Sequence, residues 1–270
     1  MILVKAGGGR DLNWDGLCAD IAGLRAAEPL VLVHGASTIR DEIAARLAIP
    51  VRTVVSPSGI SSVYTDGEAI EVFLMAYAGL ANKRLVARLL SHGVPAVGLS
   101  GVDGRLWEAA AKKDIPVLEN GRTKLLRGNL TGRVEKVNAG LLRLLVDNGY
   151  VPVVCAPAIS YEGEIVNTDN DLAAAVMAGA LGITKMVYLF EAAGLLREAG
   201  RDDTRIPRVG REGLDEVMPF AQGRMKKKIM GVRKALESGV EAVYFGDGRI
   251  AQPLRSALAG NGTVFGGAAA

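Results

Sequence analysis

Two glycine-rich segments each follow a run of apolar residues, and both have the residue types of an anion-binding loop. In the first, Lys5 ends the apolar run, and Gly7 and Gly8 follow it. In the second, Gly35 and Ala36 follow an apolar run and precede a helical pattern. Glycine lets backbone N–H groups approach a phosphate because no Cβ stands in the way. A glycine after a strand is also often only a turn, so both interpretations stay open, and neither segment matches the Walker or Rossmann fingerprint.

A polar cluster before an alanine-rich run also has two interpretations. Asn167, Asp169 and Asp171 lie just before the run that starts at Leu172. Asn and Asp are favoured helix N-caps, so the cluster could simply start a helix. In the functional interpretation, one carboxylate orients lysines or holds a metal-nucleotide, and Asn167 binds the substrate.

The stretch 222–234 contains six basic residues and no acidic residue. Lys226, Lys227 and Lys228 are adjacent, and Gly223 precedes them. Three consecutive helical residues spread over about 200°, so these lysines cannot all face one cleft. Cations at a helix N-terminus oppose the helix dipole, which suggests that an anion lies nearby. A solvated basic helix start is the alternative interpretation.

Short apolar runs that recur along the chain predict the sheet that would carry these segments. The runs lie at 2–5, 30–33, 94–99, 151–155, 185–189 and 242–245. Helical patterns separate them, for example at 17–27 and 39–48, as is typical of parallel strands with crossover helices. The predicted fold is α/β, a three-layer αβα sandwich with a mainly parallel central sheet. Because the glycine segments follow two of its strands, we expect both at the carboxyl edge, where such sheets bind ligands.

One excursion interrupts this pattern between residues 106 and 133. Val117-Leu118, the turn residues 119–122 and the residues 124–126 form the pattern of a β-hairpin with a glycine turn. Residues 101–150 carry nine Lys or Arg and six Asp or Glu, a difference equal to the whole net charge of +3. Such a patch can meet phosphates or an acidic protein, or it can be a solvated surface.

Composition excludes several other classes of protein. Apolar residues make up 49% of the 270 residues, enough for a large core, and no apolar run approaches the length of a membrane span. With only Cys18, Cys155 and two histidines, neither a disulfide framework nor a protein-held metal centre is expected. Aromatic residues at 5% and the low net charge argue against nucleic-acid binding. No signal peptide is recognised, so we expect a cytoplasmic protein without membrane partners.

Taken in order, these segments resemble the amino acid kinase family, and within it the N-acetylglutamate kinase branch. The resemblance extends from Lys5 to Thr263 and is carried by VKAGG at 4–8, VHG at 33–35, LANK at 80–83, NGYVPV at 148–153, and the segments 167–171 and 223–228. A finer resemblance is to kinases that phosphorylate 2-aminoadipate or glutamate held on a small carrier protein of the LysW type. It is carried by the segments 56–60, 64–66, 98–104, 129–132 and 221–225.

The resemblance implies ATP-dependent phosphorylation of a side-chain carboxylate to an acyl phosphate, with Mg²⁺ on the nucleotide. It implies that Lys5 and Lys228 neutralise the transferring phosphoryl group and that Asp171 holds both lysines. The residues that would contact ATP and its phosphates are Gly7, Gly8, Gly35, Gly223 and Lys228. The residues that would contact the amino acid are Gly35, Ala36, Val63 and Asn167. A carboxylate is already ionised at pH 7, so this chemistry needs no general base.

The resemblance also implies how the chain is divided into lobes and which proteins it binds. One domain, 1–270, would comprise a substrate-binding and dimerising lobe at about 1–155 and a nucleotide-binding lobe at about 156–270. The acidic, LysW-like carrier would dock on the basic excursion through Lys112, Lys113, Arg122 and Lys124. A homodimer would form through the apolar helical pattern at 68–80, for which a buried core helix is the alternative. The pathway would be lysine or arginine biosynthesis or related secondary metabolism.

Three positions depart from the family pattern. Val63 stands where the family normally has an arginine that pairs with a substrate carboxylate, so either another basic residue such as Arg52 reaches in or the substrate differs. Ala36 replaces a glycine, which requires a negative φ. Residues 190–194 replace a Ser-Asp turn near the nucleotide. A free N-acetylglutamate kinase and a catalytically silent sensor on the same fold remain the alternative functions.

Overall fold

Six apolar runs, five of them largely buried and one, at Ala96–Gly101, partly exposed, form the centre of the sheet, as their sequence pattern predicts. They are β1 (Ile2–Ala6), β2 (Leu30–His34), β5 (Ala96–Gly101), β10 (Val151–Ser160), β12 (Lys185–Phe190) and β14 (Ala242–Asp247). In the computed structural model, which describes residues 1–267, these strands pair in parallel in the order β5–β10–β2–β1–β12–β14. The predicted parallel sheet is therefore confirmed at its centre, with one strand displaced from the predicted 94–99 to 96–101.

Further strands extend this sheet at both edges, where antiparallel pairs alternate with parallel pairs. One edge carries β6 (Trp107–Lys112), β9 (Thr131–Val137) and β11 (Ile165–Thr168), and the other carries β15 (Thr263–Gly266) and β13 (Arg208–Val209). The pairs β6–β9, β10–β11 and β14–β15 are antiparallel, whereas β6–β10, β9–β11 and β13–β15 are parallel. These edge strands are short or partly polar, so the sequence contains no continuous apolar run that would predict them.

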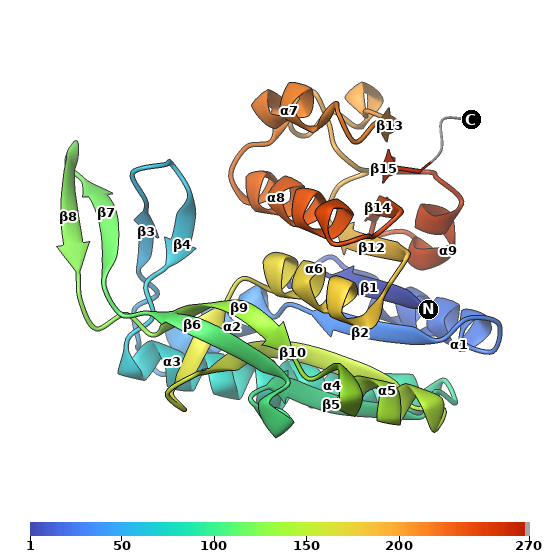
Figure 1. The fold of residues 1–270 in the computed structure, drawn as a ribbon, viewed down its shortest axis with the longest axis horizontal. Coiled ribbons are helices and arrows are strands. Elements are labelled where there is room, and N and C mark those ends of the chain that lie inside the picture. The colour runs from blue at the N-terminus through green and yellow to red at the C-terminus, as the bar shows by residue number, and fades with distance from the viewer. Residues whose placement is uncertain (268–270) are drawn as a thin grey trace.

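Helices cover both faces of the sheet (Figure 1). Alternate side chains of the central strands pack against these two layers. Ile2 and Val4 pack with α1 (Trp14–Leu24), α4 (Asn82–Ser91) and α9 (Pro253–Leu258). Leu3, which lies between them, packs with α5 (Ala139–Asp147), α6 (Asn170–Leu181) and α8 (Arg224–Glu237). The predicted three-layer sandwich is therefore confirmed. Because side chains alternate along a strand, Lys5 shares the face of Leu3, whereas His34 lies on the opposite face.

A helix of three consecutive parts covers one end of the sheet. It consists of α3 (Gly67–Phe73), the π-helical segment η1 (Leu74–Ala81) and α4. With α2 (Ser37–Arg46) it encloses a third apolar cluster around Phe73, Ala76 and Tyr77. The helix predicted at 68–80 is thus a helix whose second half is π-helical. Short helical pieces complete the described chain: α7 (Leu214–Val217), η2 (Asp103–Arg105), η3 (Asp202–Thr204) and η4 (Met218–Phe220).

Two β-hairpins project side by side from the sheet (Figure 1). The hairpin of β7 (Ile115–Glu119) and β8 (Arg122–Leu126) confirms the predicted excursion, and its turn has positive φ at Asn120 and Gly121. The hairpin of β3 (Thr53–Val55) and β4 (Ser61–Val63) was not predicted from the sequence. Its strands are three residues long and rich in Ser and Thr, so they lack an alternating apolar pattern.

Neither cysteine has the environment of a reactive thiol. Cys18 and Cys155 are free and buried, and burial raises the pKa of each thiol to about 12. Within residues 1–267, no helix has the length and apolar character needed to cross a bilayer.

Candidate active site

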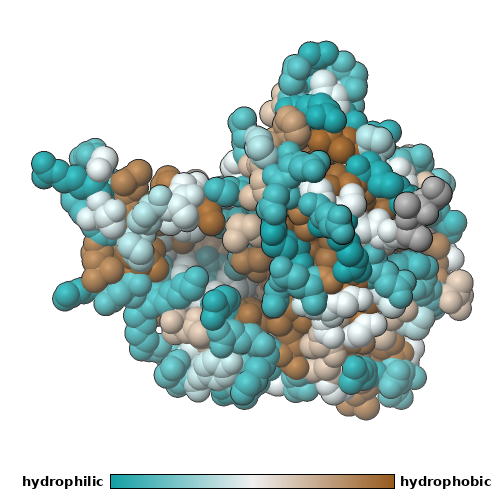
Figure 2. Space-filling model, turned by 45° about the horizontal axis from the view of Figure 1, so that its top comes forward, coloured by the Kyte–Doolittle hydropathy of each residue, from teal (hydrophilic) through white to brown (hydrophobic). Residues whose placement is uncertain are grey.

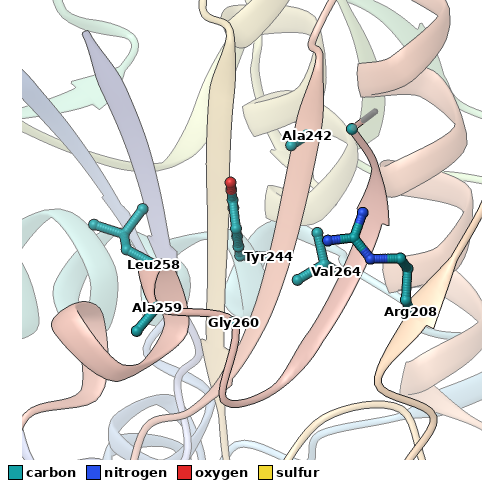
Figure 3. Close-up of a pocket in the computed structure, with 8 residues that line it drawn as sticks. Arg208, Ala242, Tyr244, Leu258, Ala259, Gly260 and Val264 are labelled. Carbon is teal, nitrogen blue, oxygen red and sulfur yellow. The ribbon is translucent and has the colours of Figure 1, made fainter. Parts of the chain in front are cut away.

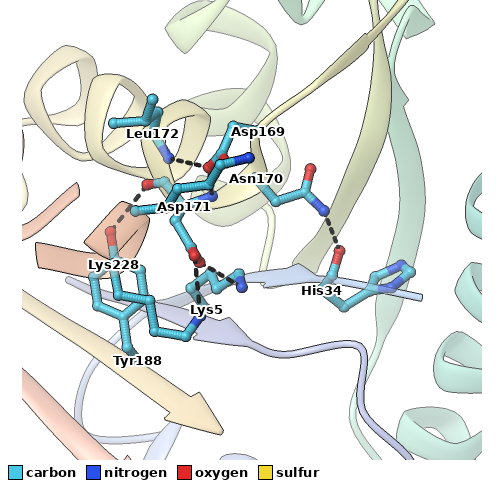
Figure 4. A network of polar contacts seen from close by, with 9 residues as sticks. Lys5, His34, Asp169, Asn170, Asp171, Leu172, Tyr188 and Lys228 are labelled. Carbon is cyan, nitrogen blue, oxygen red and sulfur yellow. Dashed lines mark hydrogen bonds and ion pairs between the residues drawn. The ribbon is translucent and has the colours of Figure 1, made fainter. Parts of the chain in front are cut away.

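Lys5, Asp171 and Lys228 form a buried cluster, which we call the lysine–aspartate cluster (Figure 4). Lys5 Nζ lies 2.5 Å from Asp171 Oδ1, and Lys228 Nζ lies 2.9 Å from Asp171 Oδ2. The three side chains are only 7%, 10% and 12% exposed for Lys5, Asp171 and Lys228. Because side chains alternate along β1, Lys5 lies on the same face as Leu3 and points toward α6, which carries Asp171, and α8, which carries Lys228. The structure therefore brings all three predicted catalytic residues together.

The electrostatics of the cluster leave an excess of positive charge. Burial of Asp171 opposes its ionisation, but the charges of Lys228 and Lys5 and their hydrogen bonds outweigh burial and hold its pKa well below the usual value. Burial lowers the pKa of Lys228 to about 8, since the attraction of Asp171 is partly cancelled by repulsion from Lys5. At neutral pH two ammonium groups therefore share one carboxylate, which suits an anionic ligand.

Backbone and helix contacts hold Asp171 at the start of α6. Asp169 is the N-cap of α6, and its Oδ1 accepts hydrogen bonds from the N–H groups of Asp171 and Leu172 at 3.0 and 3.1 Å. Tyr188 Oη donates to the carbonyl oxygen of Asp171 at 2.9 Å. The N-cap interpretation of the polar cluster is therefore confirmed, and it is compatible with the functional one. Asp169 starts the helix, and Asp171 faces the lysines.

A glycine in α8 permits the close approach that brings Lys228 to Asp171. A Cβ at Gly231 would lie 2.6 Å from Tyr188 Oη and 3.2 Å from the carbonyl oxygen of Asp171. The first distance is shorter than real Cβ contacts and the second is tight, so a side chain at residue 231 would push α8 away from α6. The sequence analysis did not single out Gly231, and its only signal was a glycine inside a helical pattern.

The three adjacent lysines at the start of α8 divide between two targets. Lys227 Nζ lies 3.3 Å from Asp169 Oδ2, beside the lysine–aspartate cluster. Lys226 points elsewhere and lies 3.4 Å from the carbonyl oxygen of Ser58 in the β3–β4 hairpin. The expectation that they could not all face one cleft is confirmed. Gly223 precedes the helix with a φ of +52°, and α8 has no capping side chain at its N-terminus.

The two glycine segments lie in backbone contact with each other. A Cβ at Gly8 would be 2.5 Å from the backbone nitrogens of both Ala36 and Ser37. A Cβ at Gly35 would be 2.8 Å from the nitrogen of Gly8. Several backbone N–H groups at the start of α2 therefore lie near the α-carbon of Gly8, which carries no side chain. No side chain caps the N-terminus of α2, where the helix dipole favours an anion.

Two of the three departures from the family pattern have a structural account. The φ of Ala36 is −151°, so alanine is accommodated without left-handed strain. In the stretch 190–194, the ring centroid of Phe190 lies 5.4 Å from Lys228 Nζ and 5.1 Å from the ring of Phe245. Phe190 therefore forms an apolar wall beside Lys228, which adds to its desolvation.

Val63 faces an apolar region. It lines a hollow together with Arg40, Phe73 and other residues of α2, α3 and the segment 49–51. Arg40 is buried, donates to Asp41 Oδ1 at 2.7 and 2.9 Å, and lies over the ring of Phe73. Arg52, proposed as the replacement for the missing arginine, stacks on Tyr64 and lies 3.8 Å from Glu119 of β7. Arg52 is thus engaged between the two hairpins, and the buried arginine near Val63 is Arg40, which the sequence analysis did not name.

The polar side chains near Asn167 include unpartnered atoms. Asn167 Nδ2 donates to Thr65 Oγ1 at 3.1 Å, and Thr65 Oγ1 donates to the carbonyl oxygen of Val63 at 3.2 Å. Among residues 1–267, Thr168 Oγ1 and Asn170 Oδ1 are buried polar atoms without a hydrogen-bond partner. Buried polar groups are normally paired, so these two atoms mark a place where a polar ligand would find partners.

Asn129 connects this region to both hairpins. Its Oδ1 accepts from the N–H of Thr65 at 3.3 Å, and its Nδ2 donates to the carbonyl oxygen of Lys112 and to Thr131 Oγ1. Asn129 is 1% exposed. It thereby joins the end of β4 to the base of the β7–β8 hairpin. An isolated Asn in a turn carried no sequence signal for this role.

The predicted carrier-docking residues lie on and beside the β7–β8 hairpin, in a different part of the molecule from the lysine–aspartate cluster (Figure 1). Lys124 pairs with Glu119 at 2.5 Å, and Lys113 pairs with Glu164 at 2.8 Å. Within the described chain, Lys112 and Arg122 are exposed and form no ion pair. Exposed apolar residues, Leu118 and Leu125, accompany them, and Figure 2 shows apolar side chains among polar ones on this projection.

An open hollow lies elsewhere, at the far edge of the sheet (Figure 3). It is lined by residues of β13, β14, β15 and the end of α9, including Arg208, Tyr244, Leu258 and Val264. No predicted site residue lines it. The chemistry of the site is therefore assigned from the lysine–aspartate cluster and the glycine segments.

The comparison with known proteins agrees with this geometry. A profile of the amino acid kinase family matches residues 1–247. The LysW-aminoadipate kinase of Deinococcus radiodurans is 46% identical over 265 residues, which cover 98% of this chain and 91% of that protein. The LysW-aminoadipate kinase of Thermus thermophilus is 43% identical over 267 residues, which cover 98% of this chain and 99% of that protein.

A solved structure extends the comparison to the fold. The N-acetylglutamate synthase of Neisseria gonorrhoeae, complexed with coenzyme A and N-acetyl-glutamate, is 27% identical with a TM-score of 0.79. The match covers 100% of this chain but only 60% of the synthase. The shared part is therefore the whole of this fold, and the synthase has a further region.

Proposed function

This chain belongs to the amino acid kinase family, and from that premise we propose that it phosphorylates a carboxylate on a carrier-bound amino acid. The substrate is 2-aminoadipate or glutamate whose amino group is held on a LysW-type carrier, and the phosphoryl donor is ATP. Two relatives with this activity in their names match almost the full length of the chain. The product is an acyl phosphate, formed in lysine or arginine biosynthesis or a related pathway.

The observation that carries this proposal is the position of Asp171 between Lys5 and Lys228. In phosphoryl transfer the protein mainly aligns the reactants and neutralises charge. The two lysines supply positive charge, and Asp171 fixes both ammonium groups. The substrate carboxylate is ionised at neutral pH and attacks without a general base. The backbone donors around Gly8, Gly35 and Ala36 stabilise the γ-phosphate, while Gly7 and Gly223 line the nucleotide path.

Magnesium enters this proposal with the nucleotide. The carboxylate of the cluster, Asp171, is already paired with Lys5 and Lys228, and the neighbouring Asp169 is paired with Lys227. Within residues 1–267 no group of three His, Cys, Asp or Glu side chains could hold a metal ion. A Mg²⁺ ion would therefore arrive bound to the ATP phosphates. There it would lower the negative charge that the lysines must balance.

The amino acid would bind beside Asn167, next to the unpartnered atoms of Thr168 and Asn170. Val63 leaves this region without the arginine that the family normally has there. The carrier, rather than a guanidinium clamp, would then supply most of the binding energy. Lys112, Lys113, Arg122 and Lys124 would attract its acidic surface, mainly speeding encounter and setting specificity.

The remaining parts of the proposal concern the whole chain. Residues 1–155 would bind the substrate and dimerise through the helix at 68–80, and residues 156–270 would bind the nucleotide. Ile70, Phe73 and Tyr77 of that helix are buried, whereas Met75 is 42% exposed and is available for a partner. The protein would work in the cytoplasm, without nucleic-acid or membrane partners.

Hydroxylamine trapping tests the proposed reaction. The protein is incubated with ATP-Mg²⁺ and, in parallel, carrier-linked aminoadipate, carrier-linked glutamate or free N-acetylglutamate. A hydroxamate that forms only with a carrier-linked acid supports the proposal. Turnover of free N-acetylglutamate would instead identify a free-substrate kinase. ATP binding without hydroxamate from any of the three acids would contradict the proposed reaction and favour a sensor.

A further inference from the structure

Glu191 directly follows β12, and the proposed chemistry makes no use of it. It belongs to the stretch 190–194, where the chain departs from the family pattern. Its Oε1 accepts a hydrogen bond from the backbone N–H of Asp11 at 2.8 Å. Asp11 lies in the loop between β1 and α1, residues 7–13, which we call the β1–α1 loop and which contains Gly8. A side chain at the end of one strand therefore holds the backbone of the loop that follows its neighbour.

Gly9 of the same loop packs directly against this carboxylate. A Cβ at Gly9 would lie 2.1 Å from Glu191 Oε2 and 2.3 Å from Glu191 Oε1. Real Cβ atoms do not approach other atoms so closely, so alanine at this position would displace the carboxylate. Gly9 does not have a positive φ, so its backbone conformation alone does not require glycine. The missing side chain leaves room for Glu191.

Three hydrogen bonds hold the β1–α1 loop along its length. The N–H of Gly7 donates to the carbonyl oxygen of Leu189 at 2.8 Å, and the N–H of Asn13 donates to the carbonyl oxygen of Gly248 at 2.8 Å. The bond to Glu191 lies between these two. The outer bonds use backbone carbonyl groups, which every residue has. The Glu191 bond needs a side-chain oxygen, so here the residue type decides whether the loop is held.

The backbone that carries Glu191 is itself fixed. The carbonyl oxygen of the preceding residue, Phe190, accepts from the N–H of Gly248 at 2.8 Å, and its ring lies 5.1 Å from that of Phe245. The Phe190 ring centroid also lies 5.4 Å from Lys228 Nζ. Two adjacent residues thus contact two parts of the site. Phe190 packs against Lys228, and Glu191 holds the β1–α1 loop.

The β1–α1 loop needs such an anchor because it begins with three consecutive glycines, residues 7–9. Glycine has more backbone freedom than any other residue, and a loop that loses this freedom only when a ligand binds binds it more weakly. We propose that Glu191 is a positioning residue, which holds residues 9–11 and thereby keeps the Gly8 backbone in the conformation that binds the ATP phosphates; this inference rests on the proposed function.

Glu42 of α2 offers a matched comparison on the same loop. Arg10 Nη2 lies 3.0 Å from Glu42 Oε1, and these two side chains are 74% and 54% exposed. Exposed ion pairs between flexible side chains contribute little. Glu42 therefore has the same charge as Glu191 but holds a side chain of the loop rather than its backbone.

The first test measures amide hydrogen exchange by NMR. Glu191→Ala removes the acceptor, whereas Glu191→Gln keeps a carbonyl oxygen at the same distance without the charge. We expect the Asp11 amide to exchange about fivefold faster or more in Glu191→Ala, and within about twofold of wild type in Glu191→Gln. Equal exchange in wild type and Glu191→Ala would overturn the proposal.

The second test measures ATP binding and turnover with the same variants. Loss of one hydrogen bond to a carboxylate predicts that Glu191→Ala raises the Kd for ATP about fivefold or more. Glu191→Gln and Glu42→Ala should stay within about twofold, and the KM for the carrier-linked substrate should not change in any of the three. If Glu191→Ala and Glu191→Gln change the Kd for ATP equally, Glu191 acts through its charge and the proposal is wrong.

Gly9→Ala approaches the same contact from the loop. Because its Cβ would displace the carboxylate, this variant should weaken ATP binding as much as Glu191→Ala does. The double variant should bind no more weakly than either single variant, since both remove one contact. Additive losses would show that the two residues act separately and would refute the anchor.

The outcomes separate this inference from the proposed function. A wild-type protein that binds no ATP would refute the proposed function, and the exchange rate of the Asp11 amide would still establish or reject the anchor. Thermal unfolding shows whether each variant is folded. If Glu191→Ala does not fold, Gly9→Ala and the comparison of Glu191→Gln with wild type decide the question.

Discussion

Asp171 is the residue on which the charge balance of the site depends. It is the carboxylate that holds both Lys5 and Lys228, and all three side chains are nearly enclosed. Removing one partner from a buried ionic group leaves the others uncompensated, which costs more than the loss of an exposed pair. Substitutions in this cluster should therefore affect both stability and rate.

The first prediction compares two neighbouring lysines. Lys228→Met should lower kcat about 100-fold or more, because it removes positive charge from the transferring phosphoryl group. Lys226→Met is the matched control, since Lys226 lies against the Ser58 carbonyl, and it should stay within about threefold. Steady-state kinetics with the carrier-linked substrate measure both. Equal losses in the two variants would contradict the assignment.

The second prediction concerns alkaline pH. The pKa of Lys228 is lowered from 10.5 to about 8, so its ammonium loses its proton as pH rises through that value. We expect kcat/KM to fall above pH 8 as the positive charge disappears. Lys228→Arg, whose guanidinium stays protonated, should remove this decline even if its overall rate is lower. A decline unchanged in Lys228→Arg would assign the titration to another group.

The third prediction concerns stability at acidic pH. The pKa of His34 is about 4 in the folded protein against 6.5 for an ordinary histidine, so the unfolded chain binds more protons between these values. The stabilisation is therefore complete above pH 6.5 and decreases as pH falls toward 4. The full difference is about 3 kcal/mol. Urea unfolding of wild type and His34→Asn should show profiles that diverge above pH 4 and converge near it. Parallel profiles would disprove the shift.

At the scale of elements, the contact between α6 and α8 determines whether the lysine–aspartate cluster can form. Gly231 allows this contact, and the chain offers a control at Gly67, where an added Cβ would meet open space. Lysine spacing on a helix predicts which way side chains point. It does not predict how closely two helices approach, because that distance depends on residues from both of them.

The fourth prediction tests that contact. Gly231→Ala should destabilise the protein by about 1–3 kcal/mol and lower kcat, because the new Cβ meets Tyr188 and the Asp171 backbone. Gly67→Ala should leave kcat unchanged and be neutral or slightly stabilising. Urea unfolding and steady-state kinetics measure the two effects. Wild-type kcat in a folded Gly231→Ala variant would show that the spacing is not critical.

The projecting hairpins are the elements that would meet the carrier. Asn129, at the base of the hairpins, is hydrogen-bonded to Thr65, and Thr65 is hydrogen-bonded to Asn167. The proposed docking surface and the proposed amino-acid site are therefore connected through these hydrogen bonds. The β7–β8 hairpin was predicted from its glycine turn and flanking apolar residues. The β3–β4 hairpin and the Asn129 contacts were not predicted, because short polar strands and buried amides have no periodic pattern.

The fifth prediction concerns this surface. Lys112→Glu combined with Arg122→Glu should raise the KM for a carrier-linked substrate at low salt and leave the KM for ATP unchanged. High salt should reduce the difference, since exposed charges are screened. Arg84→Glu, an exposed position on α4, is the control. An unchanged KM for the carrier substrate at low salt would place docking elsewhere.

At the scale of the whole molecule, the sheet explains why so much could be predicted. Parallel strands buried on both faces require continuous apolar runs, and their carboxyl ends share one edge, so the order of Lys5, Gly8 and Gly35 along the chain predicts their meeting. The antiparallel edges, the π-helical turn before Asn82 and the close approach at Gly231 depend on tertiary packing. No local pattern encodes those features.

The two helical layers contact different side chains at the carboxyl edge of the sheet. Lys5 faces α6 and α8 and forms the charged side of the site, whereas His34 faces α4 and contacts Asn82. The same strand alternation that builds the core thus places Lys5 and His34 on opposite faces of the sheet.

The most direct test of the central claim is trapping of the acyl phosphate with hydroxylamine on carrier-linked aminoadipate, with wild type and Lys228→Met assayed together. The account predicts that wild type forms one hydroxamate for each ADP released and that Lys228→Met forms almost none while remaining folded. ADP release without hydroxamate, or equal hydroxamate from both proteins, would contradict it.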